Sequence, residues 1–469
     1  MARVALTYRI PFISRVTMLP RFARWLATLS QPPNSRLLNE PEMNGAVTWD
    51  YDRHGWIPWM EFFYDWRFGD ITGDGRIDMI LTCGSHLQVA YLHDGSVLWR
   101  YEDPKSTCLD IRMDSNFPIY DLDGDGRMEL VGPRRIGGRL HLCLIDALTG
   151  ETKKSVPYPD RDTMPKNAQG GHFRSSVSIV NALGRANRRE VLVGWDYRSV
   201  TLLDADLETL WKLDLSRVGG RRHTTMGHTP DVADIDGDGR DEVLAGSCLI
   251  DHDGTLSWVA PDLEALLRDG HADSVRIASL DGEPRILMST GAYCFSRHGE
   301  LLWGIDGLRH GQALRVGKIR DDLACRQVVV YEGASRVDPR AKDRVLALDA
   351  DGNLLWSFEV VQPDMQEGGF GFWLGDWNGD GLDEVFVNDR EEVVVLDGRG
   401  RTVDRIPGHL IYVFDLVGDR RSEAVVLTDI GPGMELRVMA NDRPNPNPAT
   451  SRVVRKRRTT KEMYNATRY

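Results

Sequence analysis

The sequence predicts an all-β fold, a β-propeller of eight four-stranded antiparallel blades, from three observations. An acidic motif of the type Asp-x-Asp-Gly-Asp-Gly recurs along the 469 residues. A turn-containing apolar motif that ends in Trp follows most of its copies, and helical periodicity is nearly absent between them. Self-similarity at a period of roughly 40–60 residues is typical of solenoids and propellers, and short alternating segments separated by Gly and Asp turns indicate β-hairpins.

The acidic motif marks the first turn of each predicted blade. The four clear copies are DITGDGRIDMIL from Asp70, DLDGDGRMELVG from Asp121, DIDGDGRDEVLAG from Asp234 and DWNGDGLDEVFV from Asp376. Four degenerate copies follow the same arrangement: SIVNALGRANRREVLVG, IASLDGEPRILMS, GKIRDDLACRQVVVY and FDLVGDRRSEAVVLT. These copies together predict eight blades, and seven is the alternative if the unit near His409 is only a closing pair of strands.

The second motif predicts the outer hairpin of each blade. Examples are YLHDGSVLW, LLDADLETLW, LIDHDGTLSW, FSRHGELLW and ALDADGNLLW, in which Trp99, Trp211, Trp258, Trp303 and Trp356 end the motif. Each unit therefore reads as an inner strand, an acidic loop, two further strands and an outer strand. We expect the Trp rings to pack at the seams between neighbouring blades, because a ring of sheets must bury aromatic surface there.

The propeller is predicted over residues 61–442, between an N-terminal extension (1–60) with a basic start and a basic C-terminal tail (443–469). A closing strand, an amphipathic anchor and a mis-assigned start are all open for the extension. Only the segment PDLEALLRDGH near Leu263 has a helical pattern, and no run of 18 apolar residues predicts a membrane span. The six cysteines show no Cys-x-x-Cys spacing, which favours buried free thiols over a disulfide framework.

The clear acidic loops are predicted calcium sites with a structural role. Oxygen atoms at motif positions 1, 3, 5 and 9 can surround one hard cation, and the glycines permit the sharp turn. Turn hydrogen bonds without metal are the alternative for some loops. Bound cations would offset much of the formal charge of −12, and no basic stripe predicts nucleic-acid binding. The predicted ligands are Asp70, Asp74, Asp78, Asp121, Asp123, Asp125, Glu129, Asp234, Asp236, Asp238, Glu242, Asp376, Asn378, Asp380 and Glu384.

Five histidines share one phase of the repeat, a few residues before the acidic turn: His172, His228, His271, His310 and His409. In a propeller, equal phase means an equal position around the axis, so we expect them at one mouth of the central channel. The alternative is that they hydrogen-bond one another and fill the bore. Neighbouring segments add Trp195, Tyr197, Arg198, Arg222, His223 and Trp373 to the predicted mouth, and also Asp231, Asp273, Arg309 and Gln312. This set suits an anionic sugar, since arginine pairs with carboxylates and histidine moves protons near neutral pH.

The segment GHTPDVADIDGDGRDEVLAGSCLIDHDG, with HADSV and RHGQAL, resembles the rhamnogalacturonan lyases of polysaccharide lyase family 11 and is also similar to propeller ulvan lyases. The resemblance covers most of the propeller in pattern. It departs where His-Gly-Asp turns are expected, because Ala-Asp follows His271 and Gly-Gln follows His310. It implies a polysaccharide lyase that cleaves a glycan of rhamnose and uronic acid by β-elimination in the central cavity.

The chemistry implied by the resemblance assigns roles to the predicted mouth. His228 or His271 would be the base, Tyr197 the acid, and Arg198 or Arg222 with His310 would neutralise the uronate carboxylate. His172, His223, His409, Trp195 and Trp373 would bind substrate. The expected partner is an anionic polysaccharide or oligosaccharide, and we expect a monomer without a membrane span. The substrate class favours a secreted or periplasmic location, although no clear signal peptide is present.

Two other classes of function are open. The first is a non-catalytic, calcium-dependent carbohydrate-binding or adhesion propeller, which would bind glycans without forming product. The second is a quinoprotein-like propeller, because LIDALTGETKKS and LDADGNLLW resemble a blade motif of quinoprotein dehydrogenases. No adjacent pair of cysteines or other cofactor signature supports the second class.

Overall fold

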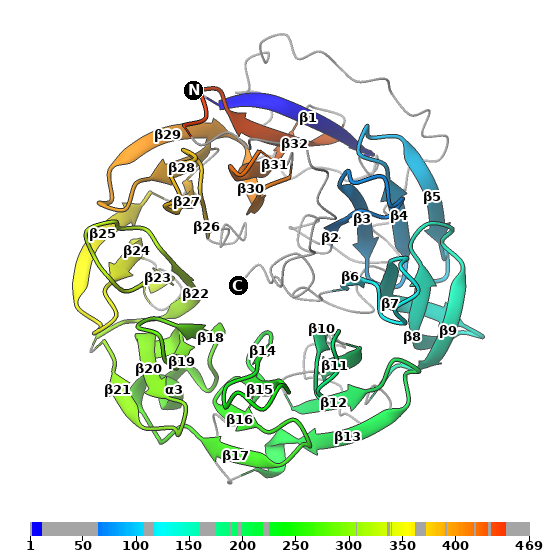
Figure 1. Cartoon of the computed structure of the whole chain (residues 1–469), viewed down its shortest axis with the longest axis horizontal. Coiled ribbons are helices and arrows are strands. Elements are labelled where there is room, and N and C mark those ends of the chain that lie inside the picture. The colour runs from blue at the N-terminus through cyan, green and yellow to red at the C-terminus, as the bar shows by residue number, and fades with distance from the viewer. Residues whose placement is uncertain are drawn as a thin grey trace.

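The computed structural model describes residues 2–11, 64–106, 117–159, 175–187, 189–195, 198–218, 225–305, 307–334, 338, 340–361, 372–389, 392–416, 419–429 and 433–446. They form eight four-stranded sheets arranged in a closed ring (Figure 1). All strand pairs within the sheets are antiparallel. The predicted eight-bladed propeller is therefore confirmed, and the seven-bladed alternative is wrong.

Each blade follows the chain from the centre of the ring outward. Blades 1 to 4 are β2 (Tyr64–Gly69), β3 (Asp78–Cys83), β4 (Leu87–Tyr91), β5 (Val97–Glu102); β6 (Ile119–Tyr120), β7 (Glu129–Ile136), β8 (Arg139–Asp146), β9 (Thr152–Pro157); β10 (Ser175–Val180), β11 (Glu190–Trp195), β12 (Ser199–Leu203), β13 (Thr209–Asp214); and β14 (Asp231–Ala233), β15 (Glu242–Ala245), β16 (Cys248–Ile250), β17 (Leu256–Val259).

Blades 5 to 7 repeat the pattern, and blade 8 combines the first and the last strands of the described residues. Their strands are β18 (Val275–Ser279), β19 (Pro284–Met288), β20 (Tyr293–Ser296), β21 (Leu301–Trp303); β22 (Gly311–Gly317), β23 (Gln327–Glu332), β24 (Asp343–Leu348), β25 (Leu354–Val360); β26 (Phe372–Gly375), β27 (Glu384–Asp389), β28 (Glu392–Leu396), β29 (Thr402–Pro407); and β30 (His409–Phe414), β31 (Glu423–Asp429), β32 (Gly433–Asn441), β1 (Ala2–Pro11).

The N-terminal strand β1 completes blade 8. It pairs antiparallel with β32 from Ala2 opposite Asn441 to Pro11 opposite Gly433, so the sheet order is β1-β32-β31-β30. The start of the chain thus supplies the outer strand of the last blade, outside the range 61–442 predicted for the propeller. A blade built from both ends of a chain closes the ring and leaves no strand edge open at that point.

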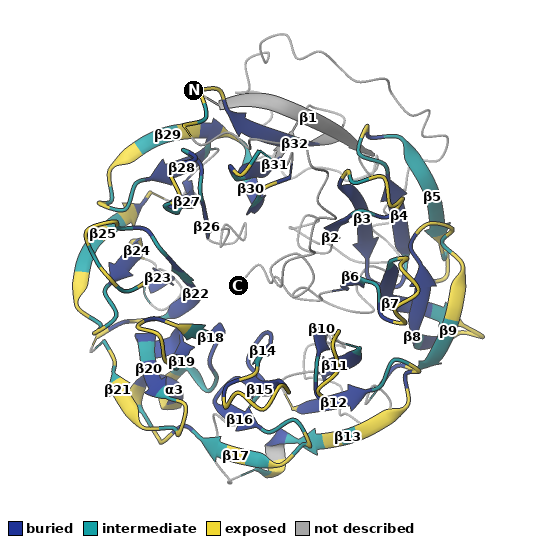
Figure 2. Cartoon of the chain, viewed as in Figure 1, coloured by how far each residue is buried: buried dark blue, intermediate teal, exposed yellow. Residues whose placement is uncertain are grey.

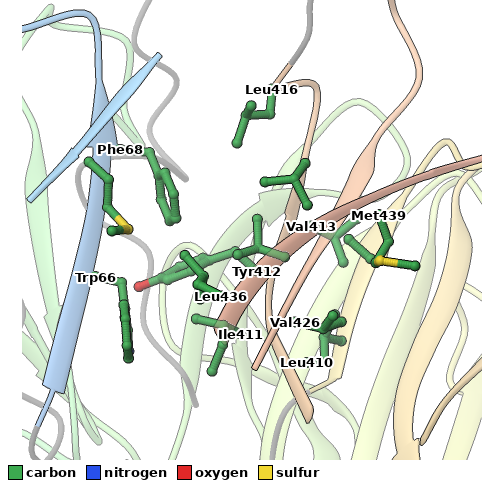
Figure 3. Close-up of a cluster of buried hydrophobic side chains, with 14 of the residues drawn as sticks. Trp66, Phe68, Leu410, Ile411, Tyr412, Val413, Leu416, Val426, Leu436 and Met439 are labelled. Carbon is green, nitrogen blue, oxygen red and sulfur yellow. The ribbon is translucent and has the colours of Figure 1, made fainter. Parts of the chain in front are cut away.

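The core lies at the seams between blades. Inner and middle strands are almost wholly buried, whereas outer strands alternate between partly buried and exposed residues (Figure 2). The seam between blade 8 and blade 1 joins Trp66 and Phe68 of β2 with Tyr412 of β30 and Leu436 of β32 (Figure 3). Polar contacts reinforce it, because the buried Arg67 pairs with Asp65 at 3.0 Å and donates to the Tyr412 hydroxyl at 2.7 Å.

The Trp motif forms a repeated seam, as predicted. Each of the five indole N–H groups donates to a backbone carbonyl in the outer hairpin of the next blade, at 2.8–3.2 Å. A glycine of that hairpin faces the ring: a Cβ added to Gly352, at φ +84°, would lie 2.6 Å from Trp303. Blade 2 has no such Trp on β9, and the buried Leu207 takes the left-handed turn position of the next hairpin, at φ 61°.

Helices are few among the described residues. The predicted helical turn is confirmed as α3 (Glu264–Asp269), and η2 (Leu215–Arg217) and η3 (Thr290–Ala292) are single 3₁₀ turns. None of the described helices is long and apolar enough to cross a membrane. The expectation of free thiols is confirmed for Cys143, Cys248, Cys294 and Cys325. It is wrong for Cys83, which is disulfide-bonded.

Candidate active site

Three of the five predicted histidines come together at one mouth of the ring. His228, His271 and His310 precede the inner strands β14, β18 and β22, which belong to the consecutive blades 4, 5 and 6. Equal phase in neighbouring blades brings the three imidazoles to one carboxylate, that of Asp273 in the segment before β18. The prediction that the mouth gathers histidines is thus met for these three.

Glycines let the three segments approach closely. Gly227 precedes His228 at φ +67°, and a Cβ there would lie 2.2 Å from the carbonyl oxygen of Ala272. Gly311 follows His310, and a Cβ there would lie 1.8 Å from the carbonyl oxygen of Ser289. Since a backbone this close leaves no room for a side chain, glycine is required at both positions. The local sequence therefore fixes how near the blades bring their histidines.

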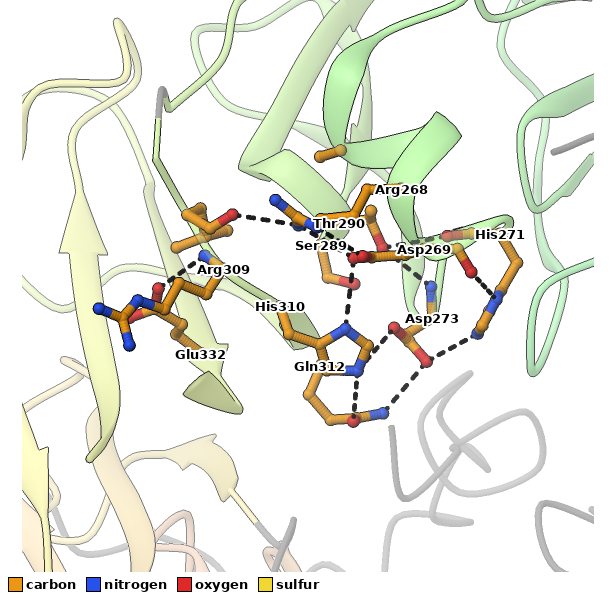
Figure 4. Close-up of polar contacts among 12 residues, drawn as sticks. Arg268, Asp269, His271, Asp273, Ser289, Thr290, Arg309, His310, Gln312 and Glu332 are labelled. Atoms are coloured by element: carbon orange, nitrogen blue, oxygen red, sulfur yellow. Dashed lines mark hydrogen bonds and ion pairs between the residues drawn. The ribbon is translucent and has the colours of Figure 1, made fainter. Parts of the chain in front are cut away.

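Asp273 is the hub of the cluster (Figure 4). Its Oδ1 lies 2.8 Å from His228 Nε2 and 3.1 Å from His271 Nε2, and its Oδ2 lies 3.4 Å from His310 Nε2. Gln312 Nε2 also donates to Oδ1, at 3.3 Å. The Asp273 side chain is only 2% exposed, so His228, His271 and Gln312 replace water at its Oδ1, whereas its buried Oδ2 has no hydrogen-bond donor and only the His310 ring nearby.

A second carboxylate supports the cluster from α3. Asp269 accepts from Arg268 Nε at 2.7 Å, and its Oδ2 lies 3.3 Å from His310 Nδ1. Burial alone would raise the pKa of Asp269, but hydrogen bonds from His310 and Arg268 outweigh it and lower that pKa. Burial likewise opposes ionisation of Asp273, yet the imidazoles of His228 and His271 hold its pKa well below the usual range. Both carboxyl groups are therefore anionic at neutral pH.

The imidazoles of His271 and His310 face oxygen atoms at both ring nitrogens. His271 faces oxygen at both ring nitrogens, with Nδ1 3.0 Å from the Asp269 carbonyl and Nε2 3.1 Å from Asp273. His310 also does so, with Nδ1 3.3 Å from the Asp269 carboxylate and Nε2 3.2 Å from Gln312 Oε1. An imidazole donates from both nitrogens only as an imidazolium, and the carboxylates of Asp269 and Asp273 on either side of His310 would stabilise that form of its ring.

The three histidines differ in their access to a ligand. The His228 side chain is 3% exposed and its ring stacks on His271 with centroids 5.5 Å apart. The side chains of His310 and His271 are 12% and 27% exposed. His271 therefore offers the most accessible imidazole, and His228 lies beneath it against Asp273.

A charged cleft lies beside His310 on the same face. Its volume is about 510 Å³, and it is lined by residues of blade 6 that include Arg309, Arg340, Lys342 and Arg344. Glu332, 1% exposed, accepts from the Arg309 backbone N–H at 2.8 Å and pairs with Arg344 at 2.6 Å. Asp338 and Glu359 also line the cleft and pair with Arg309 and Lys342, so it holds four basic and three acidic side chains next to the histidine cluster.

The other predicted mouth residues are more scattered. Arg198 is exposed on the turn between β11 and β12, and His409 begins β30 on blade 8. Trp195 is fully buried and packs against Tyr158, so its ring has no surface left for a sugar. Trp373 is 5% exposed beneath the Arg315 guanidinium, 4.5 Å away. His172, Tyr197, Arg222 and His223 lie outside the described residues.

The acidic loops lie on the opposite face of the ring. Each joins the end of an inner strand to the next strand, whereas the histidines precede the start of the inner strands. Oxygens of Asp121, Asp123 and Glu129 lie within 4.8 Å of one another, as do those of Asp234, Asp236 and Glu242. The loops therefore cannot contact a substrate held at the histidine cluster, which agrees with a structural role.

The four loops differ in their internal partners. In blade 2, Lys153 Nζ lies 2.6 Å from Asp123, 2.9 Å from Glu129 and 3.6 Å from Asp125. In blade 7, Asn378 Nδ2 donates to Glu384 at 2.7 Å, and in blade 1 Asp74 pairs with Arg76. Asp380 and Asp376 accept backbone N–H groups of their own loop, as the turn alternative expects. The carboxylates of these loops and the amide of Asn378 have the oxygen donors that a hard cation requires. The blade 2 loop, however, already holds the ammonium group of Lys153.

Reasoning from the sequence assigned no role to Asp269 or Arg268, and named Asp273 and Gln312 only as neighbours of the predicted mouth. The Asp residues of HADSV and LLRDGH stand at the same distance from His271 on either side, two residues away. That symmetrical spacing is the signal that was available in the sequence. It becomes informative only when the adjacent blades are known to place His228 and His310 beside the same segment.

With the fold and the mouth defined, comparison with known proteins gives the class. Residues 175–281 match the family model "Rhamnogalacturonan lyase family 11, C-terminal domain". The matched segment runs from β10 into blade 5 and includes His228, His271 and Asp273. The predicted resemblance to family 11 rhamnogalacturonan lyases is therefore confirmed.

Two curated relatives make the likeness more specific. The chain is 28% identical over 306 residues to the rhamnogalacturonan exolyase YesX of Bacillus subtilis (strain 168), covering 51% of this chain and 48% of the relative. It is 25% identical over 379 residues to the rhamnogalacturonan endolyase YesW of the same organism, covering 70% and 57%. The chain thus spans about half the length of the curated relatives it matches.

Solved structures share the fold. The crystal structure of YesW matches with a TM-score of 0.58 at 21% identity, over 82% of this chain and 74% of that one. The Vibrio cholerae (V. cholerae) biofilm matrix protein Bap1 matches with a TM-score of 0.53 at 16% identity, over 82% and 88%. At these identities the likeness shows the propeller alone, so the function must be argued from the site.

Proposed function

We propose that the protein is a polysaccharide lyase that cleaves a glycan of rhamnose and uronic acid by β-elimination at the histidine mouth. The observation that carries this proposal is the coincidence of two independent features. The segment similar to rhamnogalacturonan lyase family 11 contains His228, His271 and Asp273, and the same residues form a buried, charged hydrogen-bond cluster. Clusters of this kind are where perturbed acid–base groups serve catalysis.

The cluster has the charges that β-elimination requires. A uronate resists loss of its C5 proton until its carboxylate is neutralised, and the ring of His310 in its cationic form can neutralise it. The adjacent cleft has one more basic than acidic side chain in its lining, and its arginines could exchange their carboxylate partners for those of a substrate. The predicted partner, an anionic polysaccharide or oligosaccharide, follows from this arrangement.

The difference in exposure assigns roles within the predicted pair of bases. His271 is the accessible imidazole, so we place it next to the sugar, where its Nε2 would accept the C5 proton. Asp273, 3.1 Å from that nitrogen, would stabilise the imidazolium that forms. His228, nearly buried, would hold the orientation of Asp273 and of the His271 ring. Tyr197 stays the predicted acid, and Arg198 and Arg222 stay predicted partners of the carboxylate.

The proposal is tested by product formation. The full chain is incubated with rhamnogalacturonan and, separately, with a neutral galactan, and unsaturated uronate is followed by its ultraviolet absorbance. We expect an absorbance rise with rhamnogalacturonan only, and a loss of about 100-fold or more in His271→Asn. His298→Gln, an exposed histidine of a blade 5 hairpin, serves as the matched control. No unsaturated product from any uronate-containing glycan would refute the proposal.

We further propose that the acidic loops bind Ca²⁺ in a structural role. The supporting observation is the donor chemistry: carboxylate oxygens lie within 4.8 Å of one another in the loops of blades 2 and 4, with left-handed glycines such as Gly124 and Gly237 at the turn. Ions there would shape the face opposite the mouth and the outer hairpins. Chelation is therefore expected to lower the melting temperature of the protein before it alters the mouth itself.

A carbohydrate-binding or adhesion propeller is the second candidate, and the fold of Bap1, a biofilm matrix protein, supports it. Both candidates predict binding of an anionic glycan at the cleft beside His310. They differ in outcome, because a binding propeller retains intact glycan whereas a lyase releases unsaturated ends. Chromatographic size analysis of the incubated glycan separates them.

A further inference from the structure

The hairpin between the two middle strands is longer in blade 6 than in the other blades. Residues 333–342 connect β23 to β24, whereas 137–138, 246–247 and 390–391 make the same connection in blades 2, 4 and 7. Hairpin connections usually contain about 2–5 residues, and binding residues are concentrated on exposed loops. The hairpin follows the end of a second strand, so it lies on the face of the histidine mouth. It supplies Asp338, Arg340, Lys342 and two alanines to the cleft.

The cleft begins one residue from the histidine cluster. Arg309, which lines it, precedes His310, and consecutive Cα atoms are about 3.8 Å apart. In Figure 4, Arg309 and Glu332 lie on one side of His310, and His271 lies on the other. The volume of about 510 Å³ falls within the range of sites for small ligands, roughly 300–1,000 Å³. A sugar chain that leaves the mouth past His310 therefore enters this cleft.

A buried carboxylate holds one arginine of the cleft in place. Glu332 is 1% exposed, and its Oε2 accepts from Arg344 Nε at 2.7 Å and lies 2.6 Å from Arg344 Nη2. Its Oε1 accepts the Arg309 backbone N–H at 2.8 Å. The Arg344 side chain is 44% exposed, so the guanidinium is fixed along one edge and offers its other N–H groups to the cleft. A guanidinium oriented in this way is pre-organised to pair with a carboxylate.

Arg340 supplies a second guanidinium to the cleft. Its side chain is exposed, and no acidic side chain among the described residues pairs with it. Its backbone N–H donates to Asp338 Oδ1 at 3.0 Å. The other two cations have partners: Arg309 pairs with Asp338 at 3.4 Å and Lys342 pairs with Glu359, and these side chains are 49–59% exposed. Exposed ion pairs contribute little to stability, so a ligand carboxylate can replace Asp338 or Glu359 at low cost.

We propose that the blade 6 cleft is a subsite for a second uronate of the glycan, whose carboxylate binds Arg340 and Arg344. The subsite rests on the proposed function, which places the reacting uronate at the histidine mouth. A glycan of rhamnose and uronic acid carries carboxylates at intervals, so one chain can occupy both positions. Arginine suits this role because its planar fork pairs with a carboxylate through two hydrogen bonds. The cleft would therefore favour chains with several uronates over fragments with one.

Calorimetry with two rhamnogalacturonan oligosaccharides, one with a single uronate and one with several, tests the subsite. Both are titrated into the full chain in the His271→Asn background, so that they stay intact. We expect Arg340→Gln to weaken binding of the longer oligosaccharide by about tenfold, the loss of one charge-assisted hydrogen bond, and to leave the shorter one unchanged. Arg297→Gln is the matched control, since Arg297 is an exposed arginine of a blade 5 hairpin on the opposite face.

A second variant and a second probe make the test specific. Arg344→Lys keeps a cation beside the buried Glu332 but removes the planar fork, so it should also weaken binding of the longer oligosaccharide. Methyl esterification of that oligosaccharide removes its carboxylates, and the effect of Arg340→Gln should then disappear. Circular dichroism confirms that each variant is folded. Size analysis after titration shows whether the glycan is intact, and if it is cleaved, the KM values of the two oligosaccharides replace their dissociation constants.

The outcomes for the cleft and for the lyase are distinct. Equal affinity of Arg340→Gln, Arg344→Lys and Arg297→Gln for the longer oligosaccharide overturns the subsite, and so does an equal loss for both oligosaccharides in Arg340→Gln. Failure of the proposed function gives another result, the absence of unsaturated product from the wild-type chain. A glycan that stays uncleaved but whose affinity depends on its length and on Arg340 would support the cleft and refute the lyase.

Discussion

At the scale of single residues, the mouth depends on buried charge. Asp273 and Asp269 are anionic because imidazoles and Arg268 outweigh the effect of burial on their pKa values. The last glutamates of the acidic loops in blades 2, 4 and 7 show the opposite balance, since burial raises the pKa values of Glu129, Glu242 and Glu384. Burial raises the pKa of Glu384 to about 7, because its partners there are backbone N–H groups and the neutral amide of Asn378. Residue type alone therefore does not reveal which carboxylates are charged, since their partners decide it.

The raised pKa of Glu384 predicts that the stability of the protein depends on pH when a chelator keeps metal ions out of the loop. A carboxyl group whose pKa is raised by folding binds more protons in the folded state, so stability falls as pH rises from about 4.5 to about 7. Glu384→Gln is expected to remove this part of the slope. Denaturant unfolding at several pH values measures how the free energy of unfolding changes with pH. An equal pH dependence in wild type and Glu384→Gln would contradict the raised pKa of Glu384.

At the scale of elements, each blade depends on what its neighbour presents. The outer hairpin of one blade offers a carbonyl and a left-handed glycine to the Trp of the previous blade, and the acidic loop of the same blade lies beside that hairpin. These repeats were predictable because motif spacing sets strand order. The partners of the acidic loops were not, because Lys153 lies on β9, far along the chain from Asp121.

Lys153 predicts that the loop of blade 2 binds Ca²⁺ weakly. Its ammonium group lies between Asp123 and Glu129, and although burial opposes it, hydrogen bonds to both acids raise the pKa of Lys153. Lys153→Met is expected to add one Ca²⁺ to the number bound per chain, as measured by calorimetry. Lys154→Met is the matched control, since Lys154 pairs with Asp206 outside the loop. An equal Ca²⁺ stoichiometry in both variants would contradict the prediction.

The Trp seam predicts a coupled effect on stability. Gly352→Ala places a Cβ 2.6 Å from Trp303 at a left-handed φ, whereas Gly381→Ala meets only the φ cost because no atom lies within 4 Å. Gly352→Ala should therefore be more destabilising, by about 1–3 kcal/mol. Chemical denaturation of the two variants, and of Gly352→Ala combined with Trp303→Ala, measures this. When Trp303 is already Ala, Gly352→Ala should lower the free energy of unfolding by less than it does in the wild type. Equal losses in both backgrounds would show that the ring and the glycine do not interact.

At the scale of the whole molecule, sequence and structure agree on the ring, whose closure the sequence left open. The eight acidic motifs predicted eight blades, and histidine phase predicted that His228, His271 and His310 meet. Phase could not show that Asp273 organises them, because acidic residues are frequent in this chain and only the close backbone approach at Gly227 and Gly311 brings the rings to it. The pairing of Ala2–Pro11 with β32 confirms the closing strand, one of the three alternatives that the sequence left open for the N-terminal extension.

The closure predicts that the first residues stabilise the whole ring. Removal of residues 1–11 takes the outer strand from blade 8 and exposes the edge of β32. We expect a lower melting temperature and concentration-dependent aggregation, followed by differential scanning fluorimetry and light scattering. Retention of both the wild-type melting temperature and a monodisperse profile would mean that β1 contributes little to closure.

The central claim is that three consecutive blades bring their imidazoles to Asp273 to form a lyase site. Its most direct test is the initial rate of unsaturated product formation from rhamnogalacturonan by wild type and by Asp273→Asn, with circular dichroism to confirm folding. Asn keeps the shape of Asp273 but removes the charge that stabilises the cationic form of the rings. We predict a loss of about 100-fold or more in rate in a folded variant, and a folded Asp273→Asn that works at the wild-type rate would contradict the account.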